Sequence, residues 1–338
     1  MDCCQSWEEI LVNSIVTVEQ LARYFDIDIS GLRRVVSVYP MRINPYFLSL
    51  IQEVNDAIWK QAVPDVQEIE YGRYSDDPLF EEKQSPVPNL VHRYPGRVLF
   101  IVSNQCAMFC RYCMRKRRIG GFQRVNNRSI HAGLSYIRKH KDINEVILSG
   151  GDPLLLADDV IRWILIQLRA IPHIEIIRIH TRTPSSLPQR ITEALVNIIK
   201  KFHPVYINTH FNHPAEITDV AARACGRIAD AGIPLGCQTV LLKGVNDHPV
   251  IMKELMQKLL RLRVRPYYLH QADPVKGTAH FRTSIRTGLD ILKGLQSHVS
   301  GLCIPNYMID LPGGCGKVPL LPDDAKIIGN GHRPVGYD

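Results

Sequence analysis

The sequence has no apolar run of the roughly 18 or more residues that a bilayer-spanning helix requires. Its first residues carry acids and no basic stretch that leads into an apolar core, so we do not expect a secretory signal. These two absences argue against a membrane or secreted protein and predict a cytoplasmic one. The composition of the 338 residues, 45% hydrophobic and 22% charged, is that of an ordinary soluble chain of one or two domains.

An even, regularly spaced set of cysteines is also missing. There are nine cysteines, and Cys3, Cys4, Cys225, Cys237 and Cys303 are scattered along the chain. An odd and scattered set does not form a disulfide framework and suits a reducing compartment. We expect these five to be small buried or unused thiols.

The formal charge of +8 raises the question of nucleic-acid binding. Much of the local excess lies in one cluster, made of Arg111, Arg115, Lys116, Arg117 and Arg118. A surface that follows a phosphate backbone usually spreads its charge along a face and interleaves aromatic residues. A basic cluster beside anionic cofactors explains the pattern as well, so no nucleic-acid partner is predicted.

Short β-branched runs alternate with amphipathic, helix-length segments from residue 97 onward, at a spacing close to thirty residues. The expected strands are Val98–Ser103, Glu145–Ser149, Ile174–His180, Val205–His210, Leu235–Leu241 and Arg265–His270. No Gly-x-Gly-x-x-Gly turn follows the first of them, which disfavours a doubly wound sheet. The prediction is an α/β fold, a partial (β/α)6 TIM-like barrel.

The region before the barrel is predicted to be helical. Ser6 with Glu9 and Thr17 with Gln20 form capping-box patterns, and Asn44-Pro45 is typical of a helix start. The stretch from about 64 to 90 has prolines and acids but no period, so we expect a connecting segment on the surface. The predicted organisation is an N-terminal helical extension with linker (1–90), a barrel (91–300) and a C-terminal loop with a short tail (301–338).

Three cysteines, Cys106, Cys110 and Cys113, lie within eight residues just after the first expected strand. Their x3 then x2 spacing suits three irons of a four-iron cluster and leaves one iron open to a ligand. A structural zinc needs four ligands, usually in paired motifs. His131 or His140 could be a fourth ligand, but neither lies in a second paired motif, so zinc is the weaker interpretation.

Other polar residues also lie near the carboxyl ends of expected strands, where parallel barrels place their chemistry. Gly150-Gly151-Asp152 follows the second strand, and His210 ends the fourth. Gln238 is in the fifth, and Asp273 follows the sixth. Near the end of the chain, Asp310-Leu-Pro-Gly-Gly-Cys-Gly-Lys317 places a lysine behind glycines. It lacks the first-glycine spacing and the following Ser or Thr of a P-loop.

The cysteine loop, with an aromatic residue before its last cysteine, resembles that of the radical S-adenosylmethionine superfamily. With the loop that ends at Lys317, the chain resembles the lysine 2,3-aminomutase family in particular. The resemblance covers about residues 90 to 320. It implies a [4Fe-4S] cluster on the three cysteines, S-adenosylmethionine on the open iron, and pyridoxal 5′-phosphate bound as a Schiff base to Lys317.

The resemblance also implies roles for the remaining site residues. Two arginines would hold the cofactor phosphate, one arginine the substrate α-carboxylate, and two acids the ε-ammonium of lysine. Glycines and polar side chains at three strand ends would meet S-adenosylmethionine. The arginines for the phosphate are Arg93 and Arg97, and the arginine for the α-carboxylate is Arg115. The two acids for the ε-ammonium are Asp273 and Asp310. The residues that would meet S-adenosylmethionine are Gly150, Gly151, Asp152, His210 and Gln238.

The resemblance thus implies an isomerase that interconverts L-lysine and β-lysine by radical migration of the amino group. Glutamate would meet like charges at Asp273 and Asp310, while arginine or another ω-cationic amino acid fits the same charges. Supply of β-lysine for modification of elongation factor P is a further alternative. A non-catalytic iron–sulfur protein that senses redox state or binds nucleic acid is the alternative from another class.

Expected partners are a reductant such as flavodoxin or ferredoxin and a possible second copy of the chain; no membrane is expected. Longer family members carry a cysteine-rich tail for a structural zinc. No cysteine follows Cys315 here, so no zinc site is expected. His270 stands where some family members place an aromatic residue near the cofactor ring.

Overall fold

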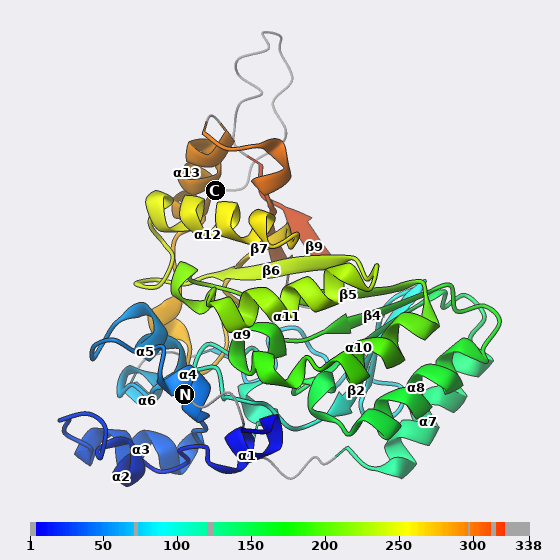
Figure 1. Cartoon of the computed structure of the whole chain (residues 1–338), viewed down its shortest axis with the longest axis horizontal. Helices are drawn as coiled ribbons and strands as arrows, with labels where there is room; N and C mark the ends of the chain where they lie inside the picture. The colour runs from blue at the N-terminus through cyan, green and yellow to red at the C-terminus, as the bar shows by residue number, and fades with distance from the viewer. Residues whose placement is uncertain (1–4, 71–73, 120–124, 297, 312–315, 322–338) are drawn as a thin grey trace, which may run out of the picture.

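The computed structural model describes residues 5–70, 74–119, 125–296, 298–311 and 316–321 (Figure 1). Its centre is one nine-stranded sheet in which the strands follow one another in chain order. The strands are β1 (Leu90–Tyr94), β2 (Arg97–Ser103), β3 (Glu145–Gly150), β4 (Ile176–His180), β5 (Val205–Thr209), β6 (Leu235–Leu241), β7 (Arg265–Gln271), β8 (Asn306–Leu311) and β9 (Gly316–Pro319).

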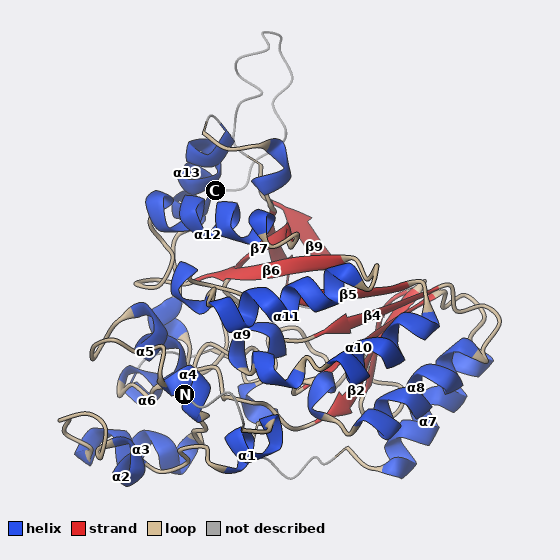
Figure 2. Ribbon diagram, in the orientation of Figure 1, coloured by secondary structure: helices blue, strands red, loops and turns tan. Residues whose placement is uncertain are grey.

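Strands β2 to β8 are all parallel, and β1 and β9 pair antiparallel at the two edges. Parallel neighbours need crossover connections, and helices supply them on the outside of the sheet (Figure 2). The helices after β2 are α7 (Asn127–Lys139), α8 (Asp158–Arg169), α9 (Thr183–Ser186), α10 (Glu193–Ile199), α11 (Asp219–Asp230), α12 (Pro249–Arg261) and α13 (Ile285–Gln296).

The first and last strands of the sheet approach each other through side chains. Arg93 on β1 donates to Asp310 Oδ1 (3.2 Å) and to the Leu311 carbonyl (2.8 Å), both on β8. Tyr94 on β1 accepts a hydrogen bond from the Lys317 amide on β9 (3.0 Å). These contacts bring the two edges of the sheet together, so the sheet curls into a nearly closed barrel.

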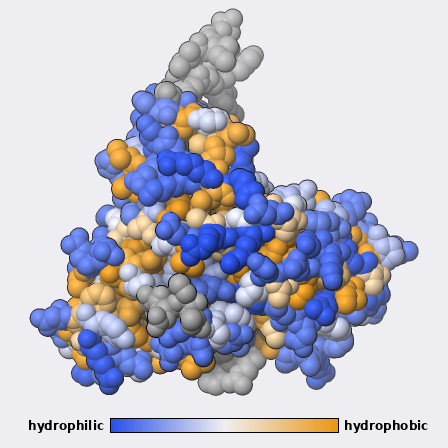
Figure 3. Space-filling view, viewed as in Figure 1, coloured by the Kyte–Doolittle hydropathy of each residue, from blue (hydrophilic) through white to orange (hydrophobic). Residues whose placement is uncertain are grey.

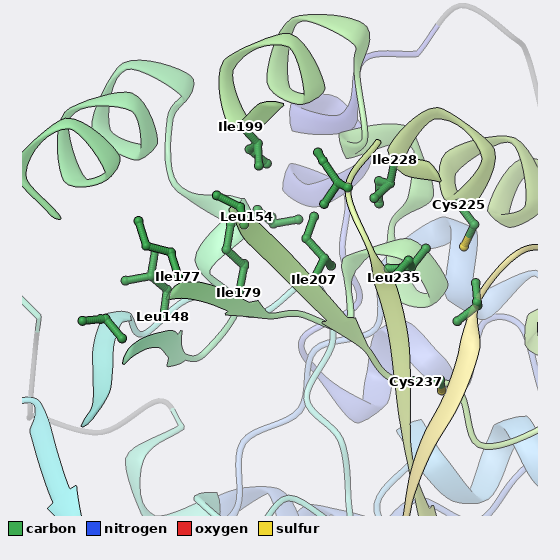
Figure 4. Close-up of a cluster of buried hydrophobic side chains, with 14 of the residues drawn as sticks. Leu148, Leu154, Ile177, Ile179, Ile199, Ile207, Cys225, Ile228, Leu235 and Cys237 are labelled. Atoms are coloured by element: carbon green, nitrogen blue, oxygen red, sulfur yellow. The ribbon is translucent and has the colours of Figure 1, made fainter. Parts of the chain in front are cut away.

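The main core lies between the sheet and its helices. Apolar side chains of β3 to β6 meet those of α10 and α11, as the labelled residues Leu148, Ile177, Ile207 and Ile199 show (Figure 4). Burial alternates along β4, β5 and β6, because alternate side chains of a strand point to opposite faces of the sheet. Outward-facing side chains are mainly hydrophilic in the view of Figure 3. No helix among the described residues is long and apolar enough to cross a membrane.

The described residues before the sheet form six short helices: α1 (Trp7–Val12), α2 (Val18–Leu21), α3 (Ser30–Val38), α4 (Pro45–Leu48), α5 (Ala57–Ala62) and α6 (Gln67–Glu70). Both expected capping boxes are present, and Asn44 caps α4. These helices have their own apolar cluster, which takes in Met108 of the cysteine loop. Asn44 also donates to the Ala107 carbonyl (3.0 Å). The N-terminal region therefore packs directly against the predicted iron-binding loop.

The predicted α/β barrel is confirmed, and its six expected strands correspond to β2 to β7. Three strands were not predicted. The seventh parallel strand, β8, and the antiparallel edges β1 and β9 lie in segments whose prolines, glycines and charges obscure the alternation of strands. The expected surface position of the stretch 64–90 is wrong in part, because Glu68, Leu79 and Glu81 within it are buried.

Candidate active site

A cavity of about 370 Å³ lies inside the curled sheet and is lined both by the start of β2, at Arg97, and by the loops that follow the carboxyl ends of the parallel strands. Its wall is formed by the cysteine loop, by several strand ends and by the two edge strands. All fourteen predicted site residues line it: Arg93, Arg97, Cys106, Cys110, Cys113, Arg115, Gly150, Gly151, Asp152, His210, Gln238, Asp273, Asp310 and Lys317. Residues more than 220 positions apart in the sequence thus share one wall.

The cysteine loop forms one end of this cavity. The N-terminal region holds the backbone of this loop. The Arg42 side chain donates to the Cys106 carbonyl (3.4 Å), and the Arg42 carbonyl accepts from the Phe109 amide (2.9 Å). The described residues include no group of three His, Cys, Asp or Glu side chains close enough to hold a single metal ion. A four-iron cluster is larger than one ion and spaces its thiolates further apart, so three thiols around a shared cavity fit a cluster of this kind.

The Gly150-Gly151-Asp152 turn joins the end of β3 to this loop. A Cβ on Gly150 would lie 2.3 Å from the Ser103 carbonyl oxygen, and one on Gly151 would lie 2.3 Å from that of Gln105. Gly150 also has φ +128°, which favours glycine. The close approach that these glycines permit is therefore to the chain itself, and their contact with a ligand remains a prediction.

The Asp152 carboxylate is already fully hydrogen-bonded within the protein. Oδ1 accepts from the Leu154 amide (3.1 Å) and the Thr181 hydroxyl (2.6 Å). Oδ2 accepts from the amides of Arg182 (2.7 Å) and Thr183 (3.0 Å). Burial nevertheless raises the pKa of this carboxyl above its ordinary value. The observed contacts tie the end of β3 to the end of β4, and a direct contact of this carboxylate with a cofactor remains a prediction.

The basic cluster beside the cysteines is neutralised by acids from the stretch 64–90. Arg115 is paired with Glu81 through both Nε and Nη2, the latter at 2.6 Å. Lys116 is 2.5 Å from Glu68, which also pairs with Arg111 at 2.6 Å. Burial lowers the pKa of Lys116 to about 8. This internal pairing argues against a phosphate-binding surface, and sequence reasoning missed it because nothing local marks Glu68 or Glu81 as buried.

The opposite end of the cavity holds Lys317 on β9. Its ammonium lies 3.0 Å from Asp310 Oδ2 and 5.4 Å from the centre of the Tyr268 ring. Asp310 also accepts from Arg93, whose Nε is buried and has no hydrogen-bond partner among the described residues. Arg97 lies over the Tyr94 ring at 4.1 Å. A lysine amine with two guanidinium groups on adjoining strands fits a phosphorylated aldehyde cofactor such as pyridoxal phosphate.

Asp273 differs from Asp310 in its electrostatics. Burial and the neighbouring Asp310 raise the pKa of Asp273 to about 7, although Lys317 and Arg115 act in the opposite direction. No hydrogen bond or ion pair of its carboxylate is among the described contacts. An added cation at this position would favour the ionised form of Asp273 and relieve its repulsion from Asp310.

Neutral imidazoles line the middle of the cavity. Burial lowers the pKa of His210 to about 3, with Arg182 adding to the effect. Burial also places the pKa values of His180 and His270 well below the ordinary value, with Lys317 contributing in both. His180 and the neighbouring guanidinium of Arg178, which pairs with Glu145, were not anticipated from the sequence. The glycine loop 313–315, including Cys315, lies outside the described residues.

Comparison with known proteins agrees with this arrangement. The family model of the radical SAM superfamily matches residues 100–255. The chain is 46% identical over 336 residues to the L-lysine 2,3-aminomutase of Clostridium subterminale, covering 97% of this chain and 80% of that one. It is 47% identical over 325 residues to the L-lysine 2,3-aminomutase of Methanococcus maripaludis, covering 93% and 75% of the two chains.

A glutamate 2,3-aminomutase, from Clostridioides difficile, is 43% identical over 320 residues and is covered to 75% of its length. Overall similarity thus extends to relatives named for two different amino acids. At these levels of identity and coverage, the chain belongs to the lysine 2,3-aminomutase family of the radical SAM superfamily.

Proposed function

We propose that this chain interconverts L-lysine and β-lysine by moving the amino group between the α and β carbons. The observation that carries the proposal is the single cavity with three cysteines at one end and Lys317, Arg93 and Arg97 at the other. Bound there, an iron–sulfur cluster with S-adenosylmethionine supplies a carbon-centred radical, and pyridoxal phosphate supplies the carbonyl that carries the migrating nitrogen.

The residues of the chain bind and orient the substrate between these groups. Arg115, held by Glu81, presents a fixed guanidinium to the substrate α-carboxylate. Asp273 and Asp310 offer two carboxylates to the distal ammonium of lysine. Lys317, which pairs with Asp310, would hold the aldehyde cofactor through its amine. Burial of Arg115 and Asp310 limits the access of water to the substrate.

Charge supports lysine over glutamate as the substrate. The distal carboxylate of glutamate would face Asp273 and Asp310 in a buried cavity, which costs several kcal/mol for like charges. Burial and repulsion from Asp310 raise the pKa of Asp273, and the distal ammonium of lysine would offset both by attracting the ionised carboxylate. Arginine carries the same charge on a longer, planar head group and is included in the test.

The test is anaerobic. The cluster is reconstituted, pyridoxal phosphate, S-adenosylmethionine and dithionite are added, and lysine, arginine and glutamate are offered separately. Each mixture is assayed for its β-amino acid and for 5′-deoxyadenosine. We expect β-lysine from lysine alone. Isomerisation of glutamate instead would overturn the assignment of Asp273 and Asp310, isomerisation of arginine instead would overturn the choice of lysine, and absence of any isomer would overturn the proposed reaction.

For the cell, we propose a one-electron donor of the flavodoxin or ferredoxin class and a cytoplasmic location. Thiolate ligands and free cysteines such as Cys225 and Cys237 suit a reducing compartment. Association with a second copy of the chain stays a prediction, which the molecular mass in solution would test.

A further inference from the structure

A buried arginine that no sequence pattern singles out contacts the cysteine loop. Arg182 follows the end of β4, and only 8% of its surface is exposed. Its Nη1 lies 2.9 Å from the Cys110 sulfur and 3.5 Å from the sulfur of Met108. A guanidinium has donors and no acceptor, so in each contact Arg182 is the hydrogen-bond donor.

The guanidinium is held in this position from several sides. Nη2 donates to Gln61 Oε1 (2.7 Å) and to Glu216 Oε2 (3.1 Å). The rings of Phe47 and Tyr112 lie 5.2 and 5.5 Å from the guanidinium carbon. A planar cation fixed by hydrogen bonds and by aromatic faces has little freedom to turn its Nη1 away from the sulfur.

The partners of Arg182 are themselves fixed. Glu216 and Gln61 are fully buried, and Glu216 Oε1 accepts from Gln61 (3.0 Å) and from the amide of Asn212 (3.0 Å). The Asn212 side chain in turn donates to Gln61 Oε1 (3.0 Å) and to the Tyr112 hydroxyl (2.6 Å). This network, defined as Gln61, Tyr112, Arg182, Asn212 and Glu216, joins the N-terminal helices, the cysteine loop and two strand ends around one sulfur.

We infer that Arg182 sets the reduction potential of the iron–sulfur cluster by donating a hydrogen bond to the Cys110 thiolate. The inference rests on the cluster of the proposed function, and it adds a positioning residue beyond the residues assigned there. The step concerned is the gain of one electron by the oxidised cluster from an external one-electron donor, with no proton transferred and no bond to the protein broken.

The direction of the effect follows from charge. The reduced cluster and its thiolates carry one more negative charge than the oxidised form. A nearby cation that donates to a ligating sulfur stabilises the reduced form more, which raises the potential. Because the guanidinium is buried, water screens this attraction weakly. Glu216 offsets part of the charge of Arg182 but lies on its Nη2, on the far side from the Cys110 contact.

The experiment compares R182M, R182K and a matched control, R190M, with the native chain. Arg190 is equally buried and is held by the carbonyls of Leu154 and Leu156 and by Asp158, but it does not line the cavity. After anaerobic reconstitution, iron and sulfide are counted. The midpoint potential is then measured by dithionite titration followed by electron paramagnetic resonance, without lysine or pyridoxal phosphate.

We expect R182M to shift the one-electron equilibrium at least tenfold toward the oxidised cluster, a potential lower by about 59 mV or more. R182K keeps the charge and should shift it less. R190M should leave the potential unchanged even if it lowers stability. An unchanged potential in R182M overturns the inference. This holds even if R182M weakens binding of S-adenosylmethionine.

R182M leaves Glu216 buried without its cation, and the variant could fail to fold for that reason. The double variant R182M/E216Q removes both charges and keeps an amide oxygen for the donors of Asn212 and Gln61. Its potential should lie below the native value but above that of R182M, because the offsetting charge of Glu216 is removed as well, and a potential equal to the native value overturns the inference. Since the readout needs no turnover, failure of the proposed lysine reaction would leave this result interpretable.

Discussion

The two ends of the cavity differ in how their buried charges are compensated. At the cysteine end, Arg182 and Glu216 lie in a network whose partners come from four segments and are nearly all satisfied. At the other end, Lys317, Asp310 and Arg93 pair mainly with one another across the meeting edges of the sheet, and Asp273 has a raised pKa. The hydrogen-bond network holds the charges of the first end in place, while we expect the charges of the second to exchange partners when a ligand enters.

The largest expected effect is at the second end. K317A removes the amine proposed to hold the aldehyde cofactor, so we expect turnover to fall by at least about 1,000-fold. The absorption band of the Schiff base should also be lost. Activity and the absorption spectrum are measured together, with the exposed Lys293→Ala on α13 as control. A retained Schiff-base band would mean that another lysine carries the cofactor.

A substitution near the cysteine end should instead lower the free energy of unfolding. E68Q leaves the buried cations Arg111 and Lys116 without their shared carboxylate, which costs about 3–5 kcal/mol for a broken buried pair. Denaturant unfolding at neutral pH measures it. Glu19→Gln breaks an exposed pair with Arg33 and should cost far less. Equal losses in the two variants would contradict the contrast between buried and exposed pairs.

Loss of one acid at the second end should change substrate use more than folding. D310N removes one partner of the substrate ammonium as well as the present partner of Lys317, and we expect kcat/KM for lysine to fall roughly 100-fold. Steady-state kinetics with lysine is the measurement. Unchanged kinetics would remove Asp310 from the substrate site.

Acid pH should weaken lysine use through Asp273. Its pKa of about 7 in the free protein means that below pH 7 the carboxyl is protonated and attracts the ammonium less. We expect kcat/KM to fall about tenfold per pH unit below 7, and D273N should flatten this part of the profile. A native-like profile in D273N would assign the titration to another group.

The same raised pKa has the opposite consequence for stability of the free protein. The folded chain keeps this proton up to about pH 7, while the unfolded chain releases it near the ordinary value of 3.8. The contribution of Asp273 to stability is therefore lost as pH rises from about 4 to 7. D273N should reduce that loss in unfolding measured across this range.

The smallest expected effects distinguish the roles of two neighbouring acids, Glu81 and Glu82. Glu82 pairs with Arg117 at an exposed position, so E82Q should change stability by no more than about 0.5 kcal/mol and leave kinetics unchanged. Glu81 pairs with Arg115 inside the cavity, and E81Q should lower kcat/KM for lysine about tenfold because the guanidinium loses its fixed orientation. Similar kinetics in the two variants would show that Glu81 does not position Arg115.

The cysteine loop and the strands of the barrel could be predicted from the sequence because each pattern depends on residues close together in the chain. A hydrophobic period specifies a strand or helix, and the x3-x2 spacing places three thiols in one loop. The capping boxes at Ser6 and Thr17 are local in the same way. By contrast, β8 and β9 were missed because prolines and glycines interrupt their segment and obscure the strand pattern.

By itself, the sequence determined the class of barrel, the ligand loop and the lysine proposed to hold the aldehyde cofactor, because each depends on residues close together in the chain. Only the tertiary structure decided which charges meet. Folding brings Glu81 to Arg115, 34 positions along the chain, and Arg182 to Cys110, 72 positions along the chain. The cost of burying an unpaired charge makes such pairs necessary, but it does not specify from sequence which residues form them.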